Sequence, residues 1–208
     1  MSTLKTTNLQ HPSAGVPAIV LDADGDATYA GVHDFSAATV TGAPQGLVHI
    51  ATESFSAVSS VSLDNVFTSN YENYKMLINV TSTGTTNFLR LRLRASSTDN
   101  TDSTYRWVIY YYEAETPSAG FNGSGWNVNT LGINLNRPYQ LLSVFEVMAP
   151  NSTAVTQFHG FGGVGALGFP VAYNGFKNDS NQYDGLTLYP DGGAITGTIR
   201  VYGYRNEA

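Results

Sequence analysis

The chain has 208 residues, a charged fraction of only 12% and a formal net charge of −6, and it contains no cysteine. Ten Lys and Arg residues are too few for the clustered cationic surface that nucleic acid requires, and the lack of cysteine excludes disulfides and thiolate-bound zinc. The N-terminal segment has no apolar core of a signal peptide, and no apolar run approaches the length of a membrane span. We therefore expect neither nucleic-acid binding nor membrane insertion.

The first 46 residues are predicted to form an extended arm and linker, distinct from a domain at residues 47–208. Large apolar residues are scarce in this segment, and three prolines interrupt it. One short apolar run, Ala18 to Leu21, precedes an Asp-Gly turn, and the returning chain is predicted to pair with it as a small hairpin. Such a hairpin is marginally stable alone, so we expect the arm to become ordered on a partner surface.

Three carboxylates in the arm, Asp22, Asp24 and Asp26, raise the question of a calcium site. An EF-hand loop needs a glycine at its sixth position and a bidentate Glu at its twelfth. Counted from Asp22, the fourth position is Gly25 and the twelfth is His33, and no helical pattern flanks the segment. We therefore interpret the segment as a solvated hairpin turn and predict no metal site.

From Leu47 onward the apolar residues recur with the period of two that is typical of half-buried strands. The clearest strand is NFLRLRLRA, in which three leucines share one face and three arginines share the other. Further strands are predicted in FSAVSSVSLDNVF, YKMLINVTS, YRWVIYYYE, YQLLSVFEVMA, AVTQFHGFG, YDGLTLYPDG and ITGTIRVYGYR. These patterns predict an all-β protein of about eight strands, an antiparallel β-sandwich of jelly-roll type preceded by the arm.

Two glycine-rich stretches are predicted to be loops. They are ETPSAGFNGSG (residues 115–125) and HGFGGVGALGFP (residues 159–170). The second is no phosphate cradle, because no Lys-Ser/Thr pair follows its glycines. We therefore predict no cofactor.

The arginines at positions 90, 92 and 94 need compensation, because like charges two residues apart on a strand repel each other. In one interpretation Arg90, Arg92 and Arg94 line a groove for an anionic glycan or for a carboxylate-bearing partner subunit. In the other they form a solvated outer face opposite acidic residues of a neighbouring strand. The candidate acidic residues are Glu113, Glu115 and Glu146.

Aromatic residues are dense between positions 107 and 139. Because successive strand residues point to opposite faces, Tyr111 cannot face the same way as Tyr110 and Tyr112, so at least one of the three should reach an outer or intersubunit surface. Tyr110, Tyr112 and Trp126 are therefore candidates for binding a sugar or a protein partner. The alternative is that the aromatic residues fill the core of the sandwich.

The sequence offers little for catalysis. Its four histidines are scattered, and neither a metalloprotease nor a hydrolase motif is present. Glu113 and Glu115 share a strand face and would be the carboxylate pair of a glycoside hydrolase. We predict a non-enzymatic protein without catalytic residues, and a carbohydrate-active sandwich is the alternative.

Segments at both ends of the chain resemble parts of tailed-bacteriophage virion proteins. LKTTNLQHPSAGVPAIVLDADGDA (residues 4–27) resembles their N-terminal openings, with a Lys-Thr-Thr, a His-Pro-Ser and an apolar-Asp-x-Asp-Gly turn. YDGLTLYPDGGAITGTIRVYGYRNEA (residues 183–208) resembles the closing strands of phage fibre, tail and capsid-appendage sandwiches, and VFTSNYENYKMLINVTST (residues 66–83) fits the same kind of domain.

This resemblance implies a structural protein of the virion, assembled in the host cytoplasm and commonly a homotrimer. Its partners would be tail, neck or capsid subunits, with a host cell-surface glycan as a further candidate. Only a short linker follows the arm, which favours a short tail fibre or appendage over a long fibre, and a capsid decoration (cement) protein is the alternative. The implied virion anchor comprises Lys5, His11, Pro12, Ile19, Val20, Leu21, Asp22, Asp24 and Gly25.

Overall fold

The structure of the protein is a computed structural model, which describes residues 8–9, 19–21, 27–29, 46–83, 88–112, 119–134, 140–164 and 169–205. The chain divides into two compact units, Met1–Pro44 and Gln45–Ala208. Every regular element in the described ranges is a β-strand. These ranges also contain no helix that is long and apolar enough to cross a membrane.

The first unit contains a three-stranded antiparallel sheet in the order β1-β2-β3, formed by β1 (Asn8–Leu9), β2 (Ile19–Leu21) and β3 (Ala27–Tyr29). The register pairs Val20 with Thr28 and confirms the predicted hairpin, and β1 is a further strand that the sequence did not predict. Several predicted anchor and turn positions lie outside the described residues: Lys5, His11, Pro12, Asp22, Asp24, Gly25 and Asp26.

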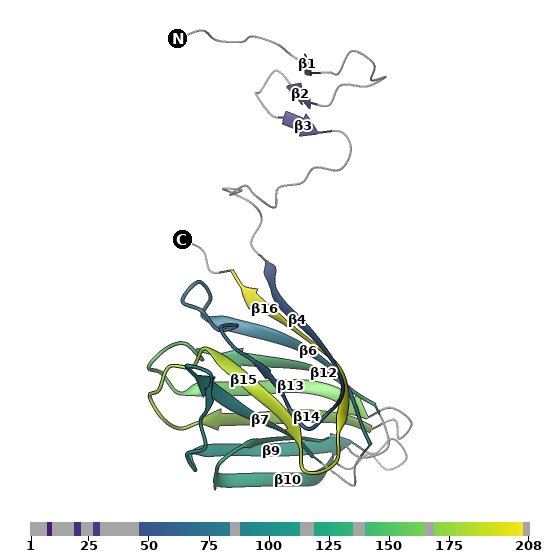
Figure 1. The fold of residues 1–208 in the computed structure, drawn as a ribbon, viewed down its shortest axis with the longest axis vertical. Helices are drawn as coiled ribbons and strands as arrows, with labels where there is room; N and C mark the ends of the chain where they lie inside the picture. Colours follow the sequence, from purple (N-terminus) through teal and green to yellow (C-terminus); the bar gives the residue numbers. More distant parts are fainter. Residues whose placement is uncertain are drawn as a thin grey trace. The chain divides into compact units, whose positions relative to one another are not determined.

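The second unit consists of two antiparallel sheets packed face to face around one core (Figure 1). The larger sheet has eight strands in the order β10-β9-β14-β13-β12-β6-β16-β4. These strands are β4 (Leu47–Val58), β6 (Asn73–Ser82), β9 (Tyr105–Tyr112), β10 (Ala119–Val128), β12 (Leu141–Met148), β13 (Thr156–Val164), β14 (Phe169–Lys177) and β16 (Ile195–Tyr204).

The smaller sheet has five strands, in the order β11-β7-β15-β5 with β8 paired to β7. They are β5 (Val61–Leu63), β7 (Phe88–Ala95), β8 (Thr98–Asp99), β11 (Leu131–Asn134) and β15 (Gly185–Pro190). The predicted all-β, antiparallel, sandwich-like architecture is confirmed, whereas the jelly-roll connectivity is not.

The core follows the predicted alternation of apolar and polar residues. Met76 and Ile78 of the larger sheet are buried, and so are Leu89, Leu91 and Leu93 of the smaller sheet. They belong to one apolar cluster that joins the two sheets. Burial of each such side chain contributes about 1.5–3 kcal/mol relative to leaving it in water, so this cluster fixes which face of each strand points outward.

Both stretches that were predicted to be loops are largely strands, so that prediction is wrong. Residues 119–125 lie in β10, while residues 159–164 and 169–170 lie in β13 and β14. Glycine is usually depleted in strands, but here it permits close approach. A Cβ at Gly125 would overlap the indole of Trp107, and one at Gly160 would overlap the carbonyl oxygen of Val144.

Candidate binding surface

The outer face of the eight-stranded sheet exposes a group of apolar side chains at its centre. Val144 of β12 is paired with Phe161 of β13 on one side and with Leu77 of β6 on the other. Phe161 is 69% exposed, Leu142 is 54% exposed and Val144 is 39% exposed. We call Leu77, Leu142, Val144 and Phe161 the central patch.

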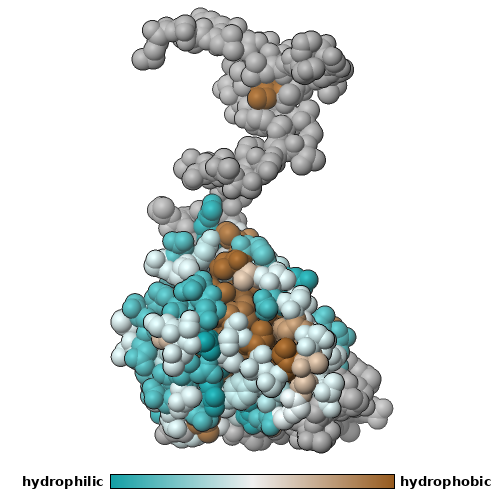
Figure 2. All heavy atoms as spheres, in the orientation of Figure 1, coloured by the Kyte–Doolittle hydropathy of each residue, from teal (hydrophilic) through white to brown (hydrophobic). Residues whose placement is uncertain are grey.

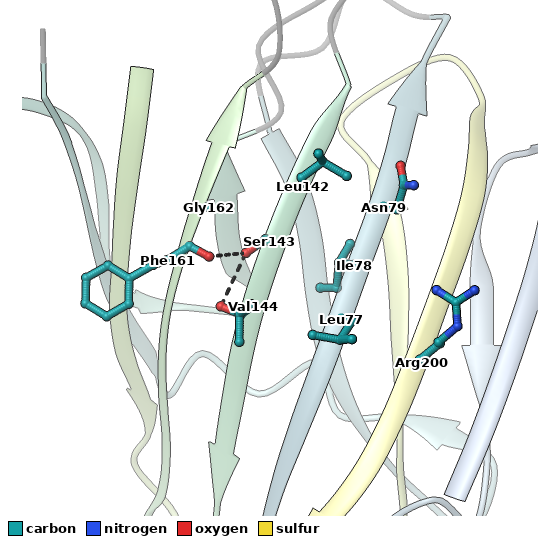
Figure 3. A pocket seen from close by; sticks show the side chains of 9 residues that line it. All are labelled: Leu77, Ile78, Asn79, Leu142, Ser143, Val144, Phe161, Gly162 and Arg200. Carbon is teal, nitrogen blue, oxygen red and sulfur yellow. Dashed lines mark hydrogen bonds between the residues drawn. The ribbon is translucent and has the colours of Figure 1, made fainter. Parts of the chain in front are cut away.

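The central patch lines a shallow hollow of about 510 Å³, with Asn79 and Arg200 at its rim. Figure 3 shows these side chains on neighbouring strands of one sheet face. Beneath them the buried hydroxyl of Ser143 donates a hydrogen bond of 3.1 Å to the carbonyl of Phe161, which fastens β12 to β13. Apolar patches rimmed by polar residues are typical of interaction surfaces.

A polar cluster next to the central patch surrounds Glu146 of β12. The Nε2 atom of His159 lies 2.6 Å from the carboxylate, the ammonium of Lys75 lies 3.8 Å from it, and the hydroxyl of Tyr204 donates a hydrogen bond to it. The hydrogen bond from Tyr204 lowers the pKa of Glu146; partial burial opposes this effect, and His159 and Lys75 add to it. The contacts of Glu146 therefore link the side chains of four strands of the sheet, β13, β12, β6 and β16.

The same hydrogen bond affects its donor. Burial, together with the hydrogen bond to the Glu146 carboxylate, raises the pKa of Tyr204 to about 12. Tyr204 therefore stays protonated at neutral pH and remains a donor to Glu146.

A second group of exposed side chains lies near the β10 edge of the same face. Trp126 of β10 is 70% exposed and is paired with Arg106 of β9, which is in turn paired with Phe176 of β14. The guanidinium carbon of Arg106 lies 4.0 Å from the ring centroid of Trp126 and 5.5 Å from that of Phe176. We call Trp126, Arg106 and Phe176 the aromatic platform.

The aromatic platform borders a hollow of about 290 Å³, to which Val108 and Asn174 also contribute. Asn174 is paired with Val108 in the register and is exposed. The sequence pointed to Trp126 only. Arg106 could have been found from the alternation in YRWVIYYYE, which places it on the face opposite Tyr105 and Trp107. Nothing in the sequence around Phe176 and Asn174 indicates that they lie beside Trp126.

Tyr110 is 41% exposed, which confirms that at least one of the three consecutive tyrosines reaches an outer surface. The side chains of Tyr111 and Tyr112 lie outside the description. Tyr105 and Trp107, on the opposite face of the same strand, are buried. The aromatic residues of this region are thus divided between the core and the surface.

The arginine row lies on the outer face of the five-stranded sheet, where aspartates compensate it. Arg90 forms two hydrogen bonds with the carboxylate of Asp191, at 2.5 and 2.8 Å. Arg94 reaches Asp64 at 2.7 Å and Asp99 at 2.5 Å. These pairs support the interpretation of the row as a compensated outer face.

Arg92 lies between these two ion pairs. Its Nε atom donates a hydrogen bond of 3.1 Å to the carbonyl of Asn129, and its guanidinium carbon lies 4.8 Å from the ring centroid of Tyr189. Glu146 is not an acidic partner of the row, because it lies on β12 in the other sheet. Glu113 and Glu115 lie outside the described residues.

A third apolar area follows the edge strand β4. In Figure 2, hydrophobic side chains form a band where β4 and β16 run in Figure 1, beside a larger hydrophilic area. Leu47 is exposed, and Ile50, Phe55 and Val58 are only partly buried against the core. Two register irregularities interrupt the pairing of β4 with β16, and such features hinder the addition of another strand at a sheet edge.

No group of three or more metal-ligating side chains occurs within the described ranges. No protein-family model matches the sequence, and no curated protein matches it. The functional argument for this chain therefore depends on its own residues.

Proposed function

We propose that the chain is a non-enzymatic structural protein of a tailed-bacteriophage virion, namely a short tail fibre or particle appendage. In this proposal residues 1–46 anchor the protein to the particle, and the β-sandwich presents a binding surface, which includes contact with the host surface. One observation carries the proposal: a small separate strand unit precedes a sandwich whose outer sheet face exposes the central patch and the aromatic platform. A capsid decoration protein is the alternative within the virion.

The ion pairs formed by the carboxylates of the sandwich support a binding function over a catalytic one. Glu146, Asp64, Asp99 and Asp191 are each held in an ion pair, across strands or beside a strand end. Catalytic carboxylates of a glycosidase must instead flank a substrate cleft. The enzymatic alternative therefore depends on Glu113 and Glu115, and a double Ala variant of these residues would test it in an assay of polysaccharide release.

The short strands of the first unit suit an anchor. A sheet with strands of two or three residues buries little apolar surface, and its outer strands leave edges to which a neighbouring chain can add a strand. The partners in this proposal are tail, neck or capsid subunits, further copies in a homotrimer, and a host cell-surface glycan. Many copies on one particle would convert weak single contacts into strong attachment.

Removal of the first unit tests the proposal. Particles would be assembled with the full chain or with a chain that begins at Gln45, and the protein would be located by immunogold electron microscopy. We expect label at the tail or neck for the full chain and none for the truncated chain. A circular dichroism spectrum would establish that the truncated sandwich is folded. Unchanged incorporation would overturn the anchoring role, and label over the capsid lattice would identify a decoration protein.

A further inference from the structure

We propose that the aromatic platform, together with Val108 and Tyr110 on the outer face of β9, is a binding site for a pyranose oligosaccharide. This inference deepens the proposed function by naming the ligand class of the exposed surface, and it rests on that function for its biological setting. The steps below concern the exposed tryptophan, its support, its polar neighbours and the length of the site.

Trp126 is unusual because it is a large aromatic side chain on a strand that is nevertheless exposed to solvent. Tryptophan is highly buried on average, whereas Trp126 is 70% exposed. An exposed indole leaves a flat apolar surface uncovered, and the C–H face of a pyranose ring is the flat, weakly polar surface that such a ring accepts. Trp126 is therefore the stacking surface of the site.

The indole of Trp126 is supported by Arg106. The guanidinium lies within 4.0 Å of the Trp126 ring centroid and 5.5 Å of the Phe176 ring centroid, so it has attractive contacts with both rings. These contacts restrain the orientation of Trp126 before any ligand arrives. A restrained surface binds more tightly than a mobile one, because less conformational entropy is lost on binding. Arg106 is thus a positioning residue.

The surroundings of the hollow suit a ligand rich in hydroxyl groups. Asn174 exposes an amide, which can both donate and accept hydrogen bonds. Arg106 is the single charged side chain among the lining residues that the structure describes. Apolar walls with a few polar groups are typical of small-ligand sites, and this mixture fits a sugar better than a phosphorylated or densely anionic ligand.

Tyr110 extends the site along β9. It lies four residues from Arg106 on the same outward face, with Val108 between them, and a strand rises about 13 Å over four residues. That distance accommodates a few linked pyranose rings, and Tyr110 would contact a ring distant from Trp126. The site is therefore matched to an oligosaccharide rather than to a monosaccharide.

The two tryptophans of the chain allow a direct test. Trp107 is buried and Trp126 is exposed, so the full chain labelled with 5-fluorotryptophan should give two ¹⁹F resonances, assigned with Trp126→Phe. The probes are maltohexaose, xylohexaose and chitotetraose, each titrated to about 10 mM, well above a millimolar dissociation constant. We expect at least one probe to shift the Trp126 resonance saturably, and by more than the resonance of Trp107, which also lines the hollow but is buried. If no probe moves the Trp126 resonance, the proposal is overturned.

Variants then test the assigned roles in full chains, with intrinsic tyrosine fluorescence or calorimetry as the readout where Trp126 is absent. Trp126→Ala should weaken binding at least about tenfold. Tyr110→Ala should weaken binding of the oligosaccharide probe that binds but leave binding of the corresponding disaccharide unchanged, and Arg106→Lys should weaken both. Leu142→Ala, which removes an exposed side chain of the central patch, is the matched control and should bind normally. Normal binding by Trp126→Ala would overturn the site.

Sugar binding is measured on the isolated chain, and particle incorporation is measured on assembled virions, so the two proposals fail separately. A chain that binds no probe but requires residues 1–44 for incorporation would retain the virion role and lose the sugar site. A chain that binds sugar but never enters particles would retain the sugar site and lose the virion role.

Discussion

The ammonium group of Lys177, which is fully buried, lies 2.9 Å from the carboxylate of Asp179. The same ammonium donates hydrogen bonds to the hydroxyl of Thr104 and to the carbonyl of Asp102, and it lies 4.5 Å from the ring centroid of Tyr105. Lysine is almost never fully buried without a partner. This group of contacts therefore joins the end of β14 to the start of β9 and to the segment that follows β14.

Replacement of Lys177 by Met should destabilise the protein strongly. The substitution keeps most of the apolar stem but leaves Asp179, whose side chain is 16% exposed, without its counter-charge. Removal of one partner of a buried ion pair costs about 3–5 kcal/mol, and urea unfolding would measure the loss. Lys75→Met is the control, because Lys75 is 3.8 Å from Glu146 and partly exposed, and its loss should be about 1 kcal/mol or less. Equal losses would contradict the argument.

The stability of the sandwich should fall in acid. Burial would raise the pKa of Asp179, but hydrogen bonds from Lys177 and Tyr183 outweigh burial and lower it, and the pKa of Glu146 is lowered as well. Both groups are therefore more acidic in the folded protein than in the unfolded chain, where their pKa values are about 4. The stability that they contribute is present above that pH and is lost as the pH falls through their folded pKa values, because the unfolded chain then binds more protons.

Urea unfolding at a series of pH values from about 6 to about 3 would measure this effect. Asp179→Asn removes one of the two titrating groups, so its free energy of unfolding should decrease less steeply with falling pH than that of the unaltered protein. If the two pH profiles are parallel, Asp179 does not carry the effect.

The sandwich could be predicted where side chains alternate. In β7 the leucines face the core and the arginines face outward, as the period of two indicated. The glycine-rich strand β10 was missed, and β13 was predicted only as far as Gly162, because glycine has no side chain with which to show a period. Their place in the sheet depends on contacts from distant segments, such as the indole of Trp107 against Gly125.

The candidate site was predictable only in part, for a related reason. Tyr110 could be named because consecutive strand residues face opposite ways, and Trp126 could be named because aromatic residues are dense in this region. Phe176 joins Trp126 only through the register that places both beside Arg106, and a single sequence does not specify pairing between such distant strands. The aspartate partners of the arginine row were not named for the same reason, since Asp64 follows β5, Asp99 lies in β8 and Asp191 follows β15.

Gly197 of β16 should be intolerant of a side chain. A Cβ at this position would overlap the carbonyl oxygen of Asn79, a backbone atom of the paired strand β6 that cannot move aside cheaply. Gly197→Ala should therefore lower the free energy of unfolding by about 1–3 kcal/mol. Gly192→Ala should change it by about 0.5 kcal/mol or less, because a Cβ added there would meet no heavy atom within 4 Å apart from its chain neighbours. Thermal and urea unfolding would test the pair, and a stable Gly197→Ala variant would show that the sheet adjusts.

Arg94 should contribute more to stability than Arg92, although the two residues share one strand face. The guanidinium of Arg94 binds Asp64 and Asp99 and donates a hydrogen bond of 2.9 Å to the hydroxyl of Thr187, which joins β7 to its neighbours. Arg94→Gln leaves two partly exposed carboxylates without a counter-charge and should cost about 1.5–3 kcal/mol in urea unfolding. Arg92→Gln loses a hydrogen bond to one carbonyl and should cost about 1 kcal/mol.

The same two variants distinguish a compensated face from an anionic binding groove. Heparin can serve as an acidic polysaccharide probe, and its binding would be measured by calorimetry at low salt. Because Asp191, Asp64 and Asp99 already neutralise Arg90 and Arg94, we expect no binding to this face. Binding that Arg92→Gln abolishes while the variant remains folded would show instead that the row recognises anions.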